Sequence, residues 1–249
     1  MSHERREGLV SSAYPEVEFG GFSRVDGLVA FYGRVQALLQ PEFTALDVGC
    51  GRGSQADDRS PFRKHLRTFR GRCRHVIGID LDPIAGDNPF LDEFRRMETP
   101  QKWPIDDSSI DLLLSDCVLE HVSDPAAFFA EAGRVVKPGG FICLRTPNAL
   151  SYVALVARIM PNRLHRRILR TAQPTRQEDD VFPTLYRCNR KGLLRRFLRD
   201  SGFDAVVYRH EGQPAYLTFS PALYRAMAVM TRHIPDFFKT TLVAFGRRK

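Results

Sequence analysis

Short apolar runs alternate with longer amphipathic stretches along most of the chain. The apolar runs predict buried strands at residues 44–49, 75–80, 110–115 and 140–146. The amphipathic stretches predict helices at residues 61–69, 126–136 and 191–202. Central strands that alternate with helices are typical of a doubly wound sheet with mostly parallel strands. The pattern therefore predicts an α/β fold.

Turn and cap residues divide the elements at the positions that this pattern requires. Ser60-Pro61 and Asn88-Pro89 predict helix starts, each with a capping side chain before a first-turn proline. The tetrapeptide KPGG at 137–140 predicts the end of a helix and the start of a strand. After Gly202, FDAVVYRH and FFKTTLVAF predict two closing strands on either side of a helix-like stretch around 221–233.

Two regions depart from the alternation. Residues 1–30 are aromatic and irregular before a helix expected near 28–39, and residues 148–188 interrupt the strand–helix order. The second region follows a strand, so it lies outside the carboxyl ends of the strands, where doubly wound sheets bind their ligands. We expect both regions to cap the binding site.

The composition narrows the class of protein. With 43% hydrophobic and 27% charged residues in 249, the chain can bury one core, which excludes disordered and collagen-like proteins. The five cysteines include no CxxC pair, so we expect reduced thiols in a cytoplasmic protein. The N-terminal stretch lacks a signal-peptide pattern, and no apolar run approaches the ~20 residues that span a bilayer.

A glycine-rich loop follows the first predicted strand. Gly49, Gly51 and Gly53 stand at alternate positions, and such a loop brings backbone N–H groups against a ligand. The third glycine comes one residue too early for the dinucleotide fingerprint GxGxxG, and Asp47 precedes the loop. The second strand ends at Asp80, where a carboxylate can accept the hydroxyls of a ribose. The loop therefore predicts a nucleotide-type ligand other than NAD.

Four segments together resemble a known family. LDVGCGRGS (46–54), VIGIDLDP (76–83), PIDDSSIDLLLSDCVLEHVSDP (104–125) and RVVKPGGFICLRTPN (134–148) are similar, in order and spacing, to the motifs of class I S-adenosylmethionine (SAM)-dependent methyltransferases. The resemblance implies a Rossmann-like, seven-stranded sheet in one domain over 1–249. Its expected parts are an N-terminal cap at 1–40, a SAM-binding core at 44–148, an inserted helical substrate cap at 149–188, and closing helices and strands at 189–249.

The resemblance also implies roles for individual residues. Asp47 and the backbone of Gly49, Gly51 and Gly53 would hold the amino-acid end of SAM, and Asp80 would hold its ribose. The purine would contact Leu81, and the stretch before Trp103 offers Glu98 for the adenine. Ser115, at the end of the strand that faces the methyl group, completes the expected cofactor contacts.

Residues 115–121 (SDCVLEH) begin at a strand end and carry the candidate catalytic groups. His121 is the natural general base because an unperturbed imidazole titrates at ~6.5, with Asp116 and Glu120 as further proton acceptors. An ordering role for His121 remains open. Some relatives carry ExxEH here and bind a divalent ion, but Cys117 replaces the first glutamate, so we expect no metal.

Positive charge gathers in the predicted cap. The net charge is +8, only six of the 37 basic residues are lysine, and residues 151–199 hold eleven arginines and one lysine against three acids. Arginine donates bidentate hydrogen bonds to phosphate and carboxylate groups, so a small anionic acceptor is one interpretation. RNA, an anionic membrane surface and a merely solvated helix face remain alternatives.

The predicted function is methyl transfer from SAM to a small molecule, with oxygen the first methylated atom expected and carbon the next. The acceptor would be a phosphate-bearing compound, glycan, lipid or natural product, and His165 and Tyr186 in the cap are candidates to bind it. RNA methylation through the basic cap and non-catalytic SAM binding are the alternatives. The lack of an RNA-binding motif disfavours nucleic acid. The oligomeric state does not follow from the sequence.

Overall fold

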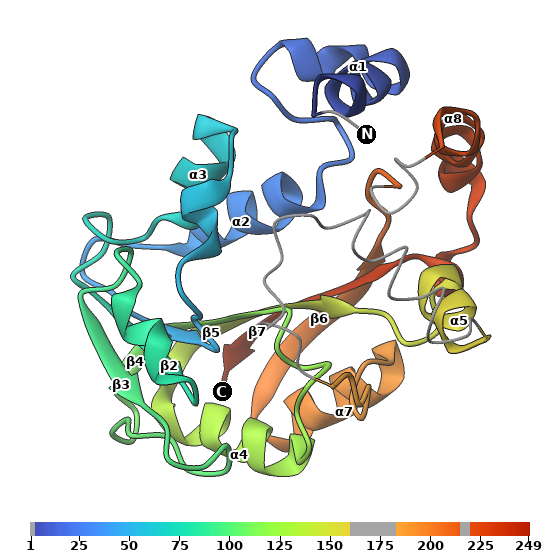
Figure 1. Cartoon of the computed structure of the whole chain (residues 1–249). Helices are drawn as coiled ribbons and strands as arrows, with labels where there is room; N and C mark the ends of the chain where they lie inside the picture. Colours follow the sequence, from blue (N-terminus) through green and yellow to red (C-terminus); the bar gives the residue numbers. More distant parts are fainter. Residues whose placement is uncertain (1–2, 160–182, 215–219) are drawn as a thin grey trace.

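A seven-stranded sheet forms the centre of the computed structural model, which describes residues 3–159, 183–214 and 220–249 (Figure 1). The strand order is β3-β2-β1-β4-β5-β7-β6, and only β7 runs antiparallel to its neighbours. The strands are β1 Thr44–Val48, β2 His75–Asp80, β3 Glu93–Arg96, β4 Ile110–Asp116, β5 Val136–Pro147, β6 Phe203–His210 and β7 Thr241–Arg248. The predicted doubly wound, mostly parallel sheet is confirmed.

Helices cover both faces of this sheet. The described helices are α1 His3–Ala13, α2 Gly27–Leu38, α3 Pro61–Arg67, α4 Pro125–Val135, α5 Tyr152–Ile159, α7 Lys191–Asp200 and α8 Pro221–Met230. Figure 1 shows α2 and α3 on one face and α4 and α7 on the other. Strand order reverses between β1 and β4, so the crevice at their carboxyl ends is the place where such sheets bind ligands.

Several helices begin at a residue whose side chain accepts a hydrogen bond from a backbone N–H group of the first turn. Asp124 caps α4 by accepting from Ala127 N, and Pro125 occupies the first turn, where its missing N–H costs no hydrogen bond. Ser60 caps α3 in the same way, as the sequence predicts. The buried face of α4 carries Phe129, whose ring stacks on Phe197 of α7 at 5.4 Å between centroids.

The sequence patterns mispredict three local features. Residues 3–13 form helix α1 in the region expected to be irregular. Asn88 ends a 3₁₀ turn at Pro83–Asp87 and starts no helix, because its side chain bonds the glycine loop instead. The strand β3 was not located, since EFRR is a half-exposed edge strand with charged residues at three of four positions.

The inserted and N-terminal regions are only partly described. Residues 160–182, which include His165 and much of the arginine cluster, lie outside the described residues. Helix α1 packs on α8 through a small apolar cluster of Leu9, Tyr14, Tyr224 and Ala228. None of the described helices is long and apolar enough to cross a membrane.

Candidate active site

The glycine loop follows β1 and has three glycines in left-handed conformations, at every second position. The φ angles are +73° at Gly49, +51° at Gly51 and +78° at Gly53, values that residues with a Cβ atom rarely adopt. A Cβ on Gly49 would overlap the Val118 side chain, and one on Gly53 would lie 2.6 Å from Asn88 Oδ1. A Cβ on Gly51 would meet no described atom within 4 Å. The backbone at Gly51 is therefore the part of the loop that is open to a ligand.

Two side chains from the next strand and its connection hold this loop. Asp80 Oδ2 accepts from Gly51 N at 3.0 Å, while its Oδ1 accepts from Asp82 N at 3.0 Å. Asn88 Nδ2 donates to the carbonyls of Cys50 and Gly51 at 3.1 and 3.0 Å. Asn88 is a supporting residue that sequence reasoning missed; its position beside a proline suggested a helix cap instead.

The remaining predicted cofactor contacts differ in their placement. Leu81 is 43% exposed directly after Asp80, and a large apolar side chain left open at this edge can cover an aromatic ligand. Glu98 is exposed just after β3, where Met97 N donates to Asp80 O at 2.8 Å. Ser115 is fully buried and donates to Val48 O at 3.2 Å. Its hydroxyl therefore ties β4 to β1, and the expected contact of Ser115 with the cofactor stays a prediction.

A cluster of charges occupies the carboxyl ends of β4 and β5. Arg145 donates to both Asp116 oxygens, from Nε at 2.7 Å and from Nη2 at 2.9 Å, and Tyr32 of α2 donates to Oδ2 at 2.8 Å. Burial opposes ionisation of Asp116, but Arg145 and Tyr32 outweigh it and lower the pKa of the carboxyl. A low pKa and committed oxygens disfavour Asp116 as the proton acceptor relative to His121.

Asp47 lies next to this cluster, and its pKa is raised whereas that of Asp116 is lowered. Burial raises the pKa of Asp47 to about 7, and the charges of Asp116 and Asp80 add to the effect, while Arg67 partly offsets it. A carboxyl held this close to neutrality gains most from a cation placed beside it, because a cation removes the cause of the shift. The site is therefore built to receive positive charge.

Arg67 at the end of α3 faces the same space. Its guanidinium carbon is 5.7 Å from the Tyr32 ring centroid, and Nη2 donates to Ser54 Oγ at 3.0 Å. Its Nε is buried without a hydrogen-bond partner among the described residues. A buried donor without an acceptor is costly, so Nε is placed for an anionic group of a ligand.

Glu120 organises the loop after β4. It is 5% exposed, its Oε2 accepts from Thr146 Oγ1 at 2.9 Å, and Asn189 Nδ2 donates to the same hydroxyl at 2.6 Å. Its backbone carbonyl accepts from Leu185 N and Tyr186 N. Burial raises the pKa of Glu120. Glu120 therefore fastens residues 183–189 to the sheet, and Tyr186 contributes its backbone to this attachment.

His121 is the candidate base with the most suitable geometry. The contact of its Nδ1 with Pro183 O, at 2.9 Å, requires a proton on Nδ1 in the neutral ring, which leaves the lone pair on Nε2. Nε2 lies 4.0 Å from Glu120 Oε1. Among the described residues, no group of three or more His, Cys, Asp or Glu side chains is arranged to hold a metal ion.

Comparison with known proteins identifies the core. Residues 46–144 match the family model described as "Methyltransferase domain". A probable S-adenosylmethionine-dependent methyltransferase of Mycolicibacterium smegmatis is 32% identical over 136 residues, which cover 52% of this chain and 48% of the relative. A ubiquinone biosynthesis O-methyltransferase of Maricaulis maris is 29% identical over 107 residues, or 43% of this chain and 41% of the relative. The chain thus matches about half, or less, of the length of these relatives.

Solved structures share the fold over most of the chain. A geranyl diphosphate C-methyltransferase of Streptomyces coelicolor, in complex with Mg²⁺, geranyl-S-thiolodiphosphate and S-adenosyl-L-homocysteine, superimposes with a TM-score of 0.55 at 17% identity. The superposition covers 89% of this chain and 75% of that one. At this level of identity the likeness concerns the fold.

The glycine loop generates a prediction about stability. Gly49→Ala should lower the melting temperature far more than Gly51→Ala, because both replacements strain a positive φ but only the first overlaps Val118. Gly51→Ala is the matched control, and its cost should stay near the ~1–2 kcal/mol of the backbone strain. Thermal unfolding followed by circular dichroism measures both; equal losses would mean that Val118 does not restrict the loop.

Proposed function

From the premise that residues 46–144 form a class I SAM-dependent methyltransferase domain, we propose that the protein transfers the methyl group of SAM to a small-molecule acceptor. The observation that carries the proposal is the open backbone at Gly51, which is bonded to Asp80 and follows the strand that carries Asp47. Oxygen is the methylated atom we expect, and carbon the next. Relatives and neighbours named as O- and C-methyltransferases support this choice.

The residues present fit the charges of SAM. SAM has an ammonium, a carboxylate, a sulfonium and a ribose diol. In our proposal Asp47 holds the ammonium, Arg67 Nε holds the carboxylate beside the open backbone at Gly51, and Asp80 accepts the ribose hydroxyls. We propose that Leu81 covers the adenine and that Glu98, exposed beyond Met97, contacts its rim.

The chain's own contribution to the reaction is positioning and charge. SAM supplies a methyl group bound to a sulfonium sulfur, and the sulfur leaves as a neutral thioether. Asp116, held ionised by Arg145 and oriented by Tyr32, places a fixed negative charge at the end of β4. His121 Nε2 takes the proton of a hydroxyl acceptor, and Glu120 keeps the loop of His121 in place through Thr146.

Cofactor binding is expected to depend on the ionisation of Asp47. SAM should bind with 1:1 stoichiometry, and its affinity should fall about tenfold per pH unit below about 7, because a protonated Asp47 cannot pair with the ammonium. Affinity should level between about pH 7 and 8, above which the α-amino group itself loses its proton. Isothermal titration calorimetry from pH 5 to 8 measures this.

The control variant for this titration is Asp47→Asn. It should bind SAM weakly and without the decline below pH 7. NAD serves as the control ligand and should give no heat. Heat from NAD and none from SAM would overturn the proposed function, whereas SAM binding that is independent of pH in the native chain would remove only the role of Asp47.

Arg67 should recognise the carboxylate of SAM. Arg67→Ala should weaken SAM binding by about ten- to a hundredfold, the usual loss for hydrogen bonds to a charged group, and leave binding of decarboxylated SAM unchanged. Arg70→Ala is the control because Arg70 is 52% exposed and pairs with Asp92 instead. The measurements belong at pH 7.5, where Asp47 is largely ionised. If Arg67→Ala weakens both ligands equally, Arg67 only supports the loop.

The role of His121 is tested by two substitutions at one position. If His121 is the general base, its replacement by Ala or by Gln should lower kcat about 10²–10⁴-fold and leave the affinity for SAM unchanged. Gln can still donate to Pro183 O, so recovery of activity in His121→Gln would assign an ordering role instead. His233→Ala, at an exposed position after α8, is the control. Label transfer from methyl-labelled SAM to a pool of hydroxylated compounds provides the assay.

A further inference from the structure

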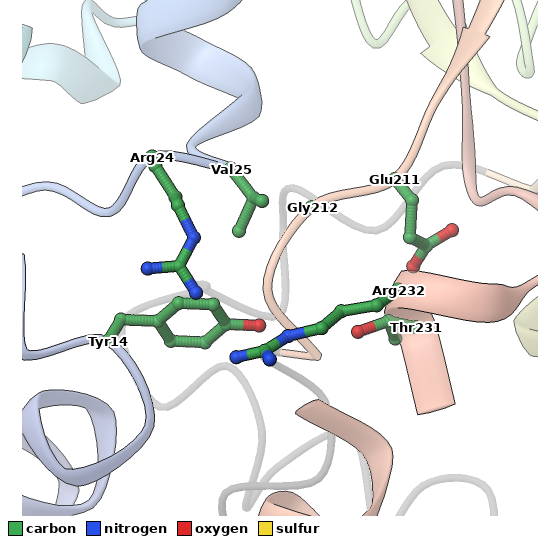
Figure 2. Close-up of a pocket in the computed structure, with 7 residues that line it drawn as sticks. All are labelled: Tyr14, Arg24, Val25, Glu211, Gly212, Thr231 and Arg232. Carbon is green, nitrogen blue, oxygen red and sulfur yellow. The ribbon is translucent and has the colours of Figure 1, made fainter. Parts of the chain in front are cut away.

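A pocket outside the glycine loop lies between the N-terminal region and the β6–β7 connection (Figure 2). Its volume is about 300 Å³, enough for a small polar group. The lining residues come from three segments: Tyr14, Arg24 and Val25 precede α2, Glu211 and Gly212 follow β6, and Thr231 and Arg232 follow α8. The pocket has no part in the site described above.

One end of the pocket carries cations around a buried hydroxyl. Figure 2 shows Arg24 above the ring of Tyr14 and the guanidinium of Arg232 next to the Tyr14 hydroxyl. Tyr14 is 2% exposed and its hydroxyl contacts the Thr231 side chain. Burial raises the pKa of Tyr14, so the hydroxyl stays protonated and can donate.

The two arginines differ in their partners. Glu16 accepts from Nη1 of Arg24 with both oxygens, each at 3.1 Å, which fixes Arg24 over the ring. Within the described ranges no carboxylate lies within ion-pair distance of Arg232, although Glu16 is near enough to feel its charge. Arg232 and Tyr14 therefore present donors without a matching anion.

The opposite end carries an acceptor. Glu211 lines the pocket and is anchored by Tyr152, whose hydroxyl donates to Oε1 at 3.2 Å, and by Thr240 N, which donates to Oε2 at 2.8 Å. Each carboxylate oxygen can accept a further hydrogen bond. A ligand that fits both ends has an anionic group and a hydroxyl.

The pocket opens on the same edge of the sheet as the proposed methyl-transfer site. The strand β6 runs parallel to β5, since both are antiparallel to β7, so Glu211 follows a carboxyl end. His210 Nε2 contacts Val25 O at 3.3 Å, and from there the chain enters α2 and reaches Tyr32, which bonds Asp116. The path from Arg24 to Tyr32 spans at most about 18 Å between Cα atoms.

We propose that this pocket binds the anionic group, a phosphate or a carboxylate, of a hydroxylated acceptor whose methylated atom lies toward Asp116. Arg232, Tyr14 and Arg24 contact the anion, and Glu211 accepts from a hydroxyl. This proposal rests on the proposed function for the direction of the acceptor. It makes the acceptor an extended small molecule with one charged end.

Calorimetry on the full chain saturated with S-adenosyl-L-homocysteine tests the pocket. The probes are glycerol 3-phosphate and glycerate, with glycerol as the uncharged control. One or both anions should bind 1:1, and Arg232→Ala should weaken that binding about tenfold or more, because a charged donor is lost. Tyr14→Phe, which keeps the ring in its apolar cluster, should weaken it by less. Arg225→Ala, an exposed position on α8, should leave it unchanged.

The readouts separate this proposal from the proposed function. Arg232→Ala should keep the native affinity for SAM, because Arg232 is remote from the glycine loop in the fold. Binding of one anion but not the other identifies the charged group. If SAM binds but neither anion does, or if both anions bind equally to Arg232→Ala and the native chain, the pocket proposal is wrong. If SAM itself does not bind, the proposed function fails first.

Discussion

Three carboxylates crowd one edge of the sheet, and the remaining features of the site depend on how their repulsion is relieved. Asp47, Asp80 and Asp116 end or nearly end the adjacent strands β1, β2 and β4. Arg145 pairs with the ionised Asp116 and Tyr32 donates to it, whereas Asp80 bonds the amide of Gly51. Asp47 is left with a pKa of about 7. A chain with a net charge of +8 thus keeps a locally acidic site, which suits a positively charged cofactor.

The glycine loop converts this electrostatic arrangement into a binding surface. Its turn is held by Asp80 from one side and by Asn88 from another, so the backbone is ordered before a ligand arrives. Pre-ordered donors and acceptors reduce the entropy that binding must overcome. Because Gly51 has no neighbour above it while Gly49 and Gly53 are tightly enclosed, the loop is open at one point only among the described contacts.

Six of the strands, the glycine loop and the positions of Asp47 and Asp80 could be predicted from the sequence because each is encoded by neighbouring residues. Tyr32, Arg67 and Arg145 could not, because they reach the site from α2, α3 and β5 and their sequence surroundings resemble ordinary helix and strand positions. The sequence places Ser115 and Asp116 at the end of β4, but it does not show the hydrogen bonds that their side chains make. Sequence position does not reveal that a hydroxyl or a carboxylate is already occupied by Val48 O or by Arg145.

The most direct test of the account is a crystal structure of the chain with S-adenosyl-L-homocysteine. The account predicts the ribose hydroxyls on Asp80, the adenine against Leu81, the amino group beside Asp47 and the carboxylate within hydrogen-bond distance of Arg67 Nε. A ligand that lies elsewhere, or one whose ammonium faces Arg67 while its carboxylate faces Asp47, would contradict it.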